Sequence, residues 1–164
     1  MNKLGWLIVV GAIIVLGIVL IRYARRIDRL HRRVVQARAT LDHALSERHR
    51  TVRSLVNNPS FDSDARITLE QVLDVASRQA TEANESALTR ALLKAQGAIT
   101  HLDTEGEHAS SAVREVGMQL AAARRFHNQE VEQVRRIRAR KLVRFFHLAG
   151  RAQLPDTYDM DDRY

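Results

Sequence analysis

The sequence predicts an all-α protein in which an N-terminal transmembrane helix continues into an antiparallel three-helix bundle. Three observations lead to this prediction. The stretch from Leu4 to Ile21 contains no charged residue, apolar residues recur at steps of three and four along most of the remaining chain, and short polar stretches interrupt this spacing. Such spacing gives a helix one apolar face, and short connections make consecutive helices antiparallel neighbours.

The composition restricts the classes of protein to consider. The chain has 164 residues, a formal net charge of +7 and no cysteine, which excludes disulfides, thiolate catalysis and cysteine-ligated zinc. Its length fits one modest domain. We expect three parts: a transmembrane anchor at 1–21, a cytoplasmic helical bundle at 22–150 and an acidic, disordered tail at 151–164.

The apolar run "LGWLIVVGAIIVLGIVLI" is long enough to cross about 30 Å of hydrocarbon as a helix. A cleaved signal peptide is the alternative interpretation. However, the run is longer than the usual apolar region of a signal peptide, only Lys3 precedes it, and "RYARRIDRLHRR" follows where small cleavage-site residues are needed. We therefore expect an uncleaved anchor, with the lipid bilayer as the partner of residues 4–21.

Basic residues are distributed unequally around this run. One lysine precedes it, whereas six arginines follow it: Arg22, Arg25, Arg26, Arg29, Arg32 and Arg33. Because positive charge is retained on the cytoplasmic side, we expect the N-terminus outside and the rest of the chain in the cytoplasm. Anionic headgroups can hold these arginines at the inner leaflet, each contributing about 1 kcal/mol.

The first helix is predicted to continue from the membrane span to Val56 without interruption. "NNPSFDSD" ends it, because Pro59 disfavours helix at the preceding residue, while Ser63 or Asp64 can cap a new helix. The apolar face of this first segment is formed by Ile27, Leu30, Val34, Ala37, Leu41, Leu45, Val52 and Leu55.

Two further helices follow in the prediction. The second begins after the cap at Ser63 or Asp64, and its apolar face runs from Leu69 to Leu102. That face changes phase near "TEANES", where we expect a kink or a short break. "DTEGEH", at 103–108, combines a glycine with acidic residues and is predicted to be a turn. The third covers 113–150, with Leu142 and Phe145 on a looser continuation of its apolar face, and a glycine followed by a proline ends it.

Three stretches carry a likeness to a known family: "RVVQARATLDHALSERHRTVRSLV" (Arg33 to Val56), "NESALTRALLKA" (Asn84 to Ala95) and "ARRFHNQEV" (Ala123 to Val131). They resemble the first helix, the middle helix and the most recognisable segment of the LemA family. The resemblance implies a bacterial inner (cytoplasmic) membrane protein with an N-terminal transmembrane helix and a cytoplasmic helical bundle. It implies no established biochemical role and carries over no catalytic residue.

The third of these stretches contains the candidate helix-seam residues Phe126, His127 and Asn128. His127 is in register with the apolar face of its helix, so we expect a hydrogen-bonded core histidine that faces the neighbouring helices. Asn128 is one step off that face and can bond across a helix pair, which would fix its register. Phe126 flanks the same face and is expected to seal its edge.

A metal site is the alternative interpretation of His101, Glu105 and His108, whose spacing would place them on one face of a continuous helix. Gly106 and the neighbouring acidic residues favour a turn instead. The chain also lacks a carboxylate pair, a nucleophile with a base, and a phosphate-binding glycine loop. We therefore expect no metal, no cofactor, no catalytic residue and no enzymatic activity.

The strongest charge feature is a candidate interaction surface near the C-terminus: Arg124, Arg125, Arg135, Arg136, Arg138, Arg140, Lys141 and Arg144. A solvated face that complements a helix C-terminus is one interpretation. A surface for an acidic partner protein, or for the acidic tail at 156–162, is the second. Contact with lipid headgroups or nucleic acid is the third, although three antiparallel arms would place this end away from the membrane.

These observations predict a membrane-anchored, non-enzymatic helical scaffold or adaptor that presents its basic C-terminal helix to an unknown protein partner. A membrane-tethered module that binds anionic ligands, either lipid headgroups or nucleic acid, is the alternative. An elongated coiled-coil dimer, in which the helices form a stalk as a homo-oligomer, is a further alternative.

Overall fold

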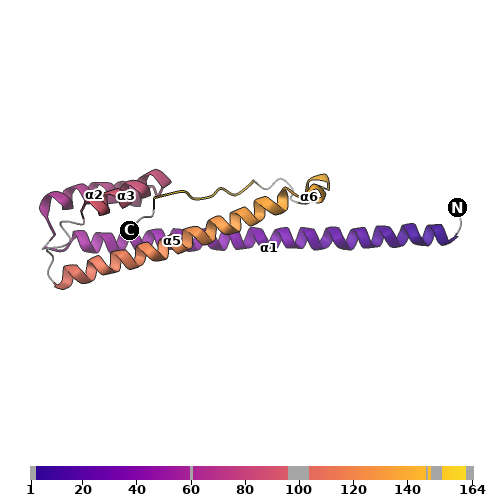
Figure 1. The fold of residues 1–164 in the computed structure, drawn as a ribbon, viewed down its shortest axis with the longest axis horizontal. Helices are drawn as coiled ribbons and strands as arrows, with labels where there is room; N and C mark the ends of the chain where they lie inside the picture. Colours follow the sequence, from indigo (N-terminus) through magenta and orange to yellow (C-terminus); the bar gives the residue numbers. More distant parts are fainter. Residues whose placement is uncertain (1–2, 60, 96–103, 147, 149–152, 162–164) are drawn as a thin grey trace. The chain divides into compact units, whose positions relative to one another are not determined.

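The computed structural model describes residues 3–59, 61–95, 104–146, 148 and 153–161, and every regular element within them is a helix (Figure 1). The all-α prediction is therefore confirmed. The helices are α1 (Lys3–Val56), α2 (Ser63–Arg78), α3 (Glu82–Lys94), α5 (Thr104–Arg138) and α6 (Lys141–Phe145). The chain divides into unit 1, Met1–Gln36 with Gln129–Asp156, and unit 2, Ala37–Asn128 with Thr157–Tyr164.

The first helix, α1, runs without a break from the apolar stretch to Val56, as predicted. The next helix is capped one residue earlier than expected. Asp62 has an extended backbone, and its carboxylate accepts from the backbone N–H groups of Asp64 and Ala65 at 3.1 and 2.9 Å. It therefore satisfies two donors that the start of α2 would otherwise leave free.

The predicted break in the second helical segment is confirmed and lies at residues 79–81. Helix α2 ends at Arg78, and α3 begins at Glu82 with Thr81 as its N-cap. The Thr81 hydroxyl accepts from the backbone N–H of Asn84 at 3.3 Å. A capping threonine after an extended residue explains why the apolar spacing changes phase here.

The predicted turn at 103–108 is wrong for residues 104–108, because they form the start of α5. Gly106 costs a helix about 1 kcal/mol relative to alanine, but burial of Ser110 and Val113 in the following turns favours the helix. In the metal alternative, His101 and the side chain of Glu105 lie outside the described residues.

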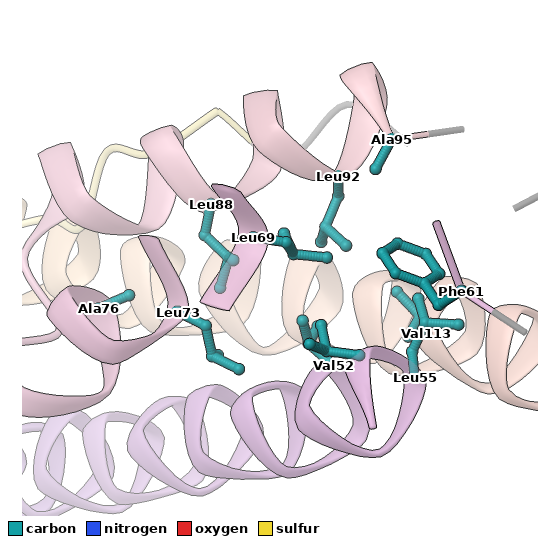
Figure 2. Close-up of a cluster of buried hydrophobic side chains, with 11 residues drawn as sticks. Val52, Leu55, Phe61, Leu69, Leu73, Ala76, Leu88, Leu92, Ala95 and Val113 are labelled. Carbon is teal, nitrogen blue, oxygen red and sulfur yellow. The ribbon is translucent and has the colours of Figure 1, made fainter. Parts of the chain in front are cut away.

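The core of unit 2 gathers apolar side chains from four helices (Figure 2). Leu88 of α3 lies among Leu73 of α2 and Val52 of α1, and all three are almost inaccessible to solvent. Val52 and Leu55 cluster with Val113 of α5. A neighbouring cluster joins Leu41 and Leu45 to Leu120, so α1 and α5 run antiparallel within this unit.

The core of unit 1 is smaller and joins α1, α5 and α6. Its buried residues are Ile27, Leu30, Val34, Val131, Val134, Ile137 and Val143. We expected one continuous third helix with Leu142 and Phe145 on its apolar face. Instead α5 ends at Arg138, and the phase changes before α6, so that Val143 is buried while Leu142 and Phe145 are exposed.

The apolar start of α1 differs from a core helix. Within the described residues, α1 is the helix long and apolar enough to cross a membrane, and none of its most apolar window is buried against the rest of the chain. Large side chains such as Trp6, Leu7 and Ile13 are more than half exposed. The apolar start of α1 is therefore uncovered by the described part of the chain.

The core of unit 2 yields a stability prediction. Leu88→Ala removes a fully buried side chain from α3 and should lower the free energy of unfolding by about 2–5 kcal/mol, since a cavity remains. Urea unfolding of the full chain in detergent micelles, followed by circular dichroism, measures the change. Leu93→Ala on the same helix removes a half-exposed side chain and should cost less than about 1 kcal/mol. Equal losses would contradict the packing.

Candidate functional site

The residues of the candidate basic surface do not all lie on one helix or in one unit. Arg124 and Arg125 belong to unit 2, and the other six residues of the surface belong to unit 1. There, three arginines occupy the last turn of α5, Arg140 is the N-cap of α6, and Lys141 and Arg144 lie in α6. Arg136, Arg140, Lys141 and Arg144 are exposed.

Two of these arginines contact the C-terminal segment. Arg135 donates to the backbone carbonyl of Pro155 at 3.2 Å and lies 3.6 Å from the Asp156 carboxylate. Arg138 donates to the carbonyl of Gln153 at 3.1 Å. The Asp156 side chain is 95% exposed, so its ion pair contributes under about 1 kcal/mol. Of these contacts, only the pair with Asp156 involves the acidic stretch 156–162, and the other two are to backbone carbonyls that precede it.

The three helix-seam residues have different environments. His127 is buried, as its register predicted. Phe126 is 49% exposed, and its role at the edge of the apolar face stays a prediction. Asn128 makes two hydrogen bonds to one backbone residue: its amide donates to the Tyr158 carbonyl at 3.1 Å, and its Oδ1 accepts from the Tyr158 N–H at 2.8 Å. Asn128 therefore holds the C-terminal segment rather than another helix.

The expected disorder of the tail is wrong for residues 157–161. Tyr158 and Met160 are buried in the cluster of Leu41, Leu45 and Leu120. The backbone of the segment bonds to side chains of α3: the Asp159 N–H donates to Glu82 and the Asp161 N–H to the Ser86 hydroxyl, both at 2.9 Å. Side-chain acceptors thus order a segment that has no helical spacing of its own.

The Tyr158 side chain fixes this segment from within. Its hydroxyl donates to the carbonyl of Ala80 at 2.8 Å, and the Arg38 guanidinium lies 5.2 Å from the ring centroid. Burial raises the pKa of Tyr158 to about 12, because it disfavours the charged phenolate, and the negative charge of Glu85 adds to this effect, while Arg38 opposes it. The neutral phenol is therefore the form that docks.

A buried charged cluster links α1 to α3 in unit 2. Arg48 donates to one oxygen of Glu85 at 2.9 Å and to the Thr89 hydroxyl at 2.8 Å. His49 Nε2 lies 2.6 Å from the other Glu85 oxygen. Arg48 and Glu85 are 1% and 0% exposed. Thr89 also donates to the Asp161 carbonyl at 2.8 Å, so the cluster reaches the C-terminal segment.

The buried pair of Arg48 and Glu85 was not predicted, although the sequence contains a signal for it. Arg48 stands on the apolar face of its helix, three residues after Leu45 and four before Val52, and Glu85 stands three residues before Leu88. Charged residues at core positions of two segments predict a buried pair. Chemically the cluster is closed: both carboxylate oxygens are bonded, and the described residues contain no group of three potential metal ligands. Its role is to set the register of α3 on α1.

Within unit 1 the cations of α6 lie beside the end of the apolar run. Arg140 donates to the Tyr23 hydroxyl at 3.5 Å, and Tyr23 follows Ile21 by two residues. Tyr23 also packs against the core that contains Val143. The expectation that the basic end lies away from the apolar run is wrong within unit 1, because α5 and α6 return along α1 to the end of the apolar stretch.

The charged cluster yields the second prediction. Glu85→Gln removes the charge that compensates buried Arg48 and should cost about 3–5 kcal/mol of unfolding free energy, measured by urea unfolding in micelles. Glu82→Gln is the matched control, since Glu82 lies on the same helix, is exposed, and its oxygen can still accept from Asp159. The assignment fails if both variants unfold at the same urea concentration.

The raised pKa of Tyr158 yields the third prediction. A folded-state pKa above the unfolded value means that the stability from the neutral phenol is fully present below pH 10 and is lost as the pH rises towards about 12. Of the three tyrosines, one should therefore ionise late in a titration followed by phenolate absorbance. Tyr158→Phe should remove that late ionisation, whereas Tyr164→Phe should leave it. Loss of an ordinary ionisation from Tyr158→Phe would refute the assignment.

Comparisons with protein-family models, curated proteins and solved structures found no match.

Proposed function

We propose that this chain is a single-pass membrane protein whose helical domain acts as a non-enzymatic scaffold or adaptor. One observation carries the proposal. The apolar stretch of α1 is not buried by the rest of the chain, and the same helix continues into the residues that build the cores of both units. A rigid helical connection between an anchor and a folded domain suits a protein that holds a surface at a membrane.

The location belongs to the same proposal. We place the protein in the bacterial inner membrane, with the N-terminus outside and the helical domain in the cytoplasm. Six arginines after the apolar run against one lysine before it support this orientation. The likeness of three stretches to the LemA family supports the membrane-anchored helical domain and the bacterial source.

Within unit 1, the partner surface of the adaptor would centre on Arg136 of α5. Arg136 is exposed, whereas Arg135 and Arg138 already contact the C-terminal segment. An acidic protein is the partner that this charge favours.

Binding of anionic lipid is a second candidate function, and the contact between Arg140 and Tyr23 favours it. Binding of nucleic acid is supported only by the positive net charge of the chain. The stalk dimer has less support, because the apolar face of α1 is covered by α5 within each unit. A helix whose apolar face is already covered has little surface left for a coiled-coil partner.

Photocrosslinking in intact cells tests the adaptor. A photoreactive residue replaces Arg136, and the same residue replaces Arg53, an exposed arginine of α1, as the matched control. We expect one acidic protein to be captured from position 136 and not from position 53, in the membrane fraction. Lipid or nucleic acid at position 136 would favour the second candidate, and equal products at both positions would refute a specific surface.

A further inference from the structure

Helix α6 buries one apolar side chain in the core of unit 1 and exposes two others. Val143 is 1% exposed and lies in the core with Ile137 and Leu30. Phe145 is 76% exposed and Leu142 is 48% exposed. A helix this short does not persist in water by itself, so the core contact of Val143 positions a small apolar surface that the described chain leaves uncovered.

Cations surround this apolar surface. Arg140 precedes α6, and Lys141 and Arg144 lie within it, all of them exposed. Aromatic and aliphatic side chains flanked by lysine and arginine are typical of elements that lie in the interface of an anionic membrane. The long side chains of such cations can also extend towards phosphates while the neighbouring rings insert.

The position of α6 agrees with this chemistry. The Arg140 guanidinium donates to the Tyr23 hydroxyl, and Tyr23 lies two residues beyond the apolar run of the same helix. Tyrosine is enriched where a transmembrane helix leaves the hydrocarbon. Because Tyr23 and α6 belong to the same unit, α6 lies at the depth of the headgroups whenever the apolar run spans a bilayer.

A second cationic surface lies on α1 next to the end of the apolar run and consists of the six arginines between residues 22 and 33. Its six arginines recur at steps of three and four, which places them on one face, while Ile27, Leu30 and Val34 occupy another. All six are exposed, and Asp28 is the acidic residue that lies among them. Five of the six lie further along the helix than Tyr23, where headgroup phosphates are the available anions.

We propose that α6 is a second membrane contact, in which Phe145 and Leu142 insert into the interface and Arg140, Lys141 and Arg144 bind the phosphates of anionic lipids. The inference rests on the proposed membrane anchor, and it assigns to lipid a part of the basic surface that the adaptor does not need. The apolar stretch would hold the chain in the bilayer, while α6 would fix unit 1 against the bilayer surface.

Tryptophan fluorescence in vesicles tests the contact with the full chain. Trp6 is the single tryptophan and reports on the anchor in the unmodified protein. Phe145→Trp in a Trp6→Phe background reports on α6, and Leu142→Trp in that background gives an independent reading. Each protein is reconstituted in phosphatidylcholine vesicles, with or without phosphatidylglycerol, made from ordinary or brominated lipids, because bromine quenches a tryptophan that touches it.

We expect brominated lipid to quench Trp6 in every vesicle, and to quench the introduced tryptophan about twofold when phosphatidylglycerol is present. Adding Lys141→Glu and Arg144→Glu should remove the quenching of the introduced tryptophan. Arg53→Glu with Arg90→Glu is the matched control, because it makes the same change of charge at exposed positions of unit 2. This control should leave the quenching of the introduced tryptophan unchanged. Circular dichroism checks that each variant retains its helical content.

The outcomes separate the inference from the proposed function. Quenching of Trp6 without quenching at position 145 or 142 would overturn the membrane contact of α6 and leave the anchor intact. Failure to quench Trp6 would overturn the anchor itself. Equal quenching of the introduced tryptophan without phosphatidylglycerol, or after charge reversal, would overturn the role of anionic lipid. A protein captured at Phe145 by photocrosslinking, with no lipid quenching, would replace the lipid by a protein partner.

Discussion

The buried carboxylate of Glu85 is the constraint to which most of unit 2 is adjusted. Placing a charged group out of water is costly unless its partners have good geometry and its remaining lone pairs are bonded. Arg48 and His49 each take one oxygen, and Thr89 takes the second Arg48 donor. These bonds can form only in one register of α3 on α1, so an apolar core that could slide is given a unique arrangement.

The same cluster extends to the C-terminal segment. Thr89 donates to the Asp161 carbonyl, and the charge of Glu85 contributes to the raised pKa of Tyr158. The segment has no strand partner, so its backbone groups need other acceptors and donors if they are to leave water. Asn128, Glu82 and Ser86 supply them. An acidic tail is thus ordered by side chains that were placed for it on α5 and α3.

Sequence spacing predicted what is local and missed what is distant. The uninterrupted α1, the break before α3 and the burial of His127 follow from spacing within one helix. The docking of Tyr158 does not, because its partners are 30 and 78 residues away and one of them is a backbone carbonyl. The helical conformation of Gly106 was missed because burial in later turns outweighs its low propensity. Glu85 and Arg48 could have been found, since both occupy core positions.

For the proposed anchor, the residues at the end of the apolar run determine how deep α1 lies in a bilayer. Moving the helix inward by one turn would bring Arg22 and Arg25 towards the hydrocarbon, where a charged side chain is disfavoured. Moving it outward would expose Ile18 and Ile21 to water. Within unit 1, Ile27 and Leu30 join α1 to Val143, so the depth of the anchor also sets the depth of α6. An exposed phenylalanine at that depth faces the interface, where an aromatic ring is stabilised rather than penalised.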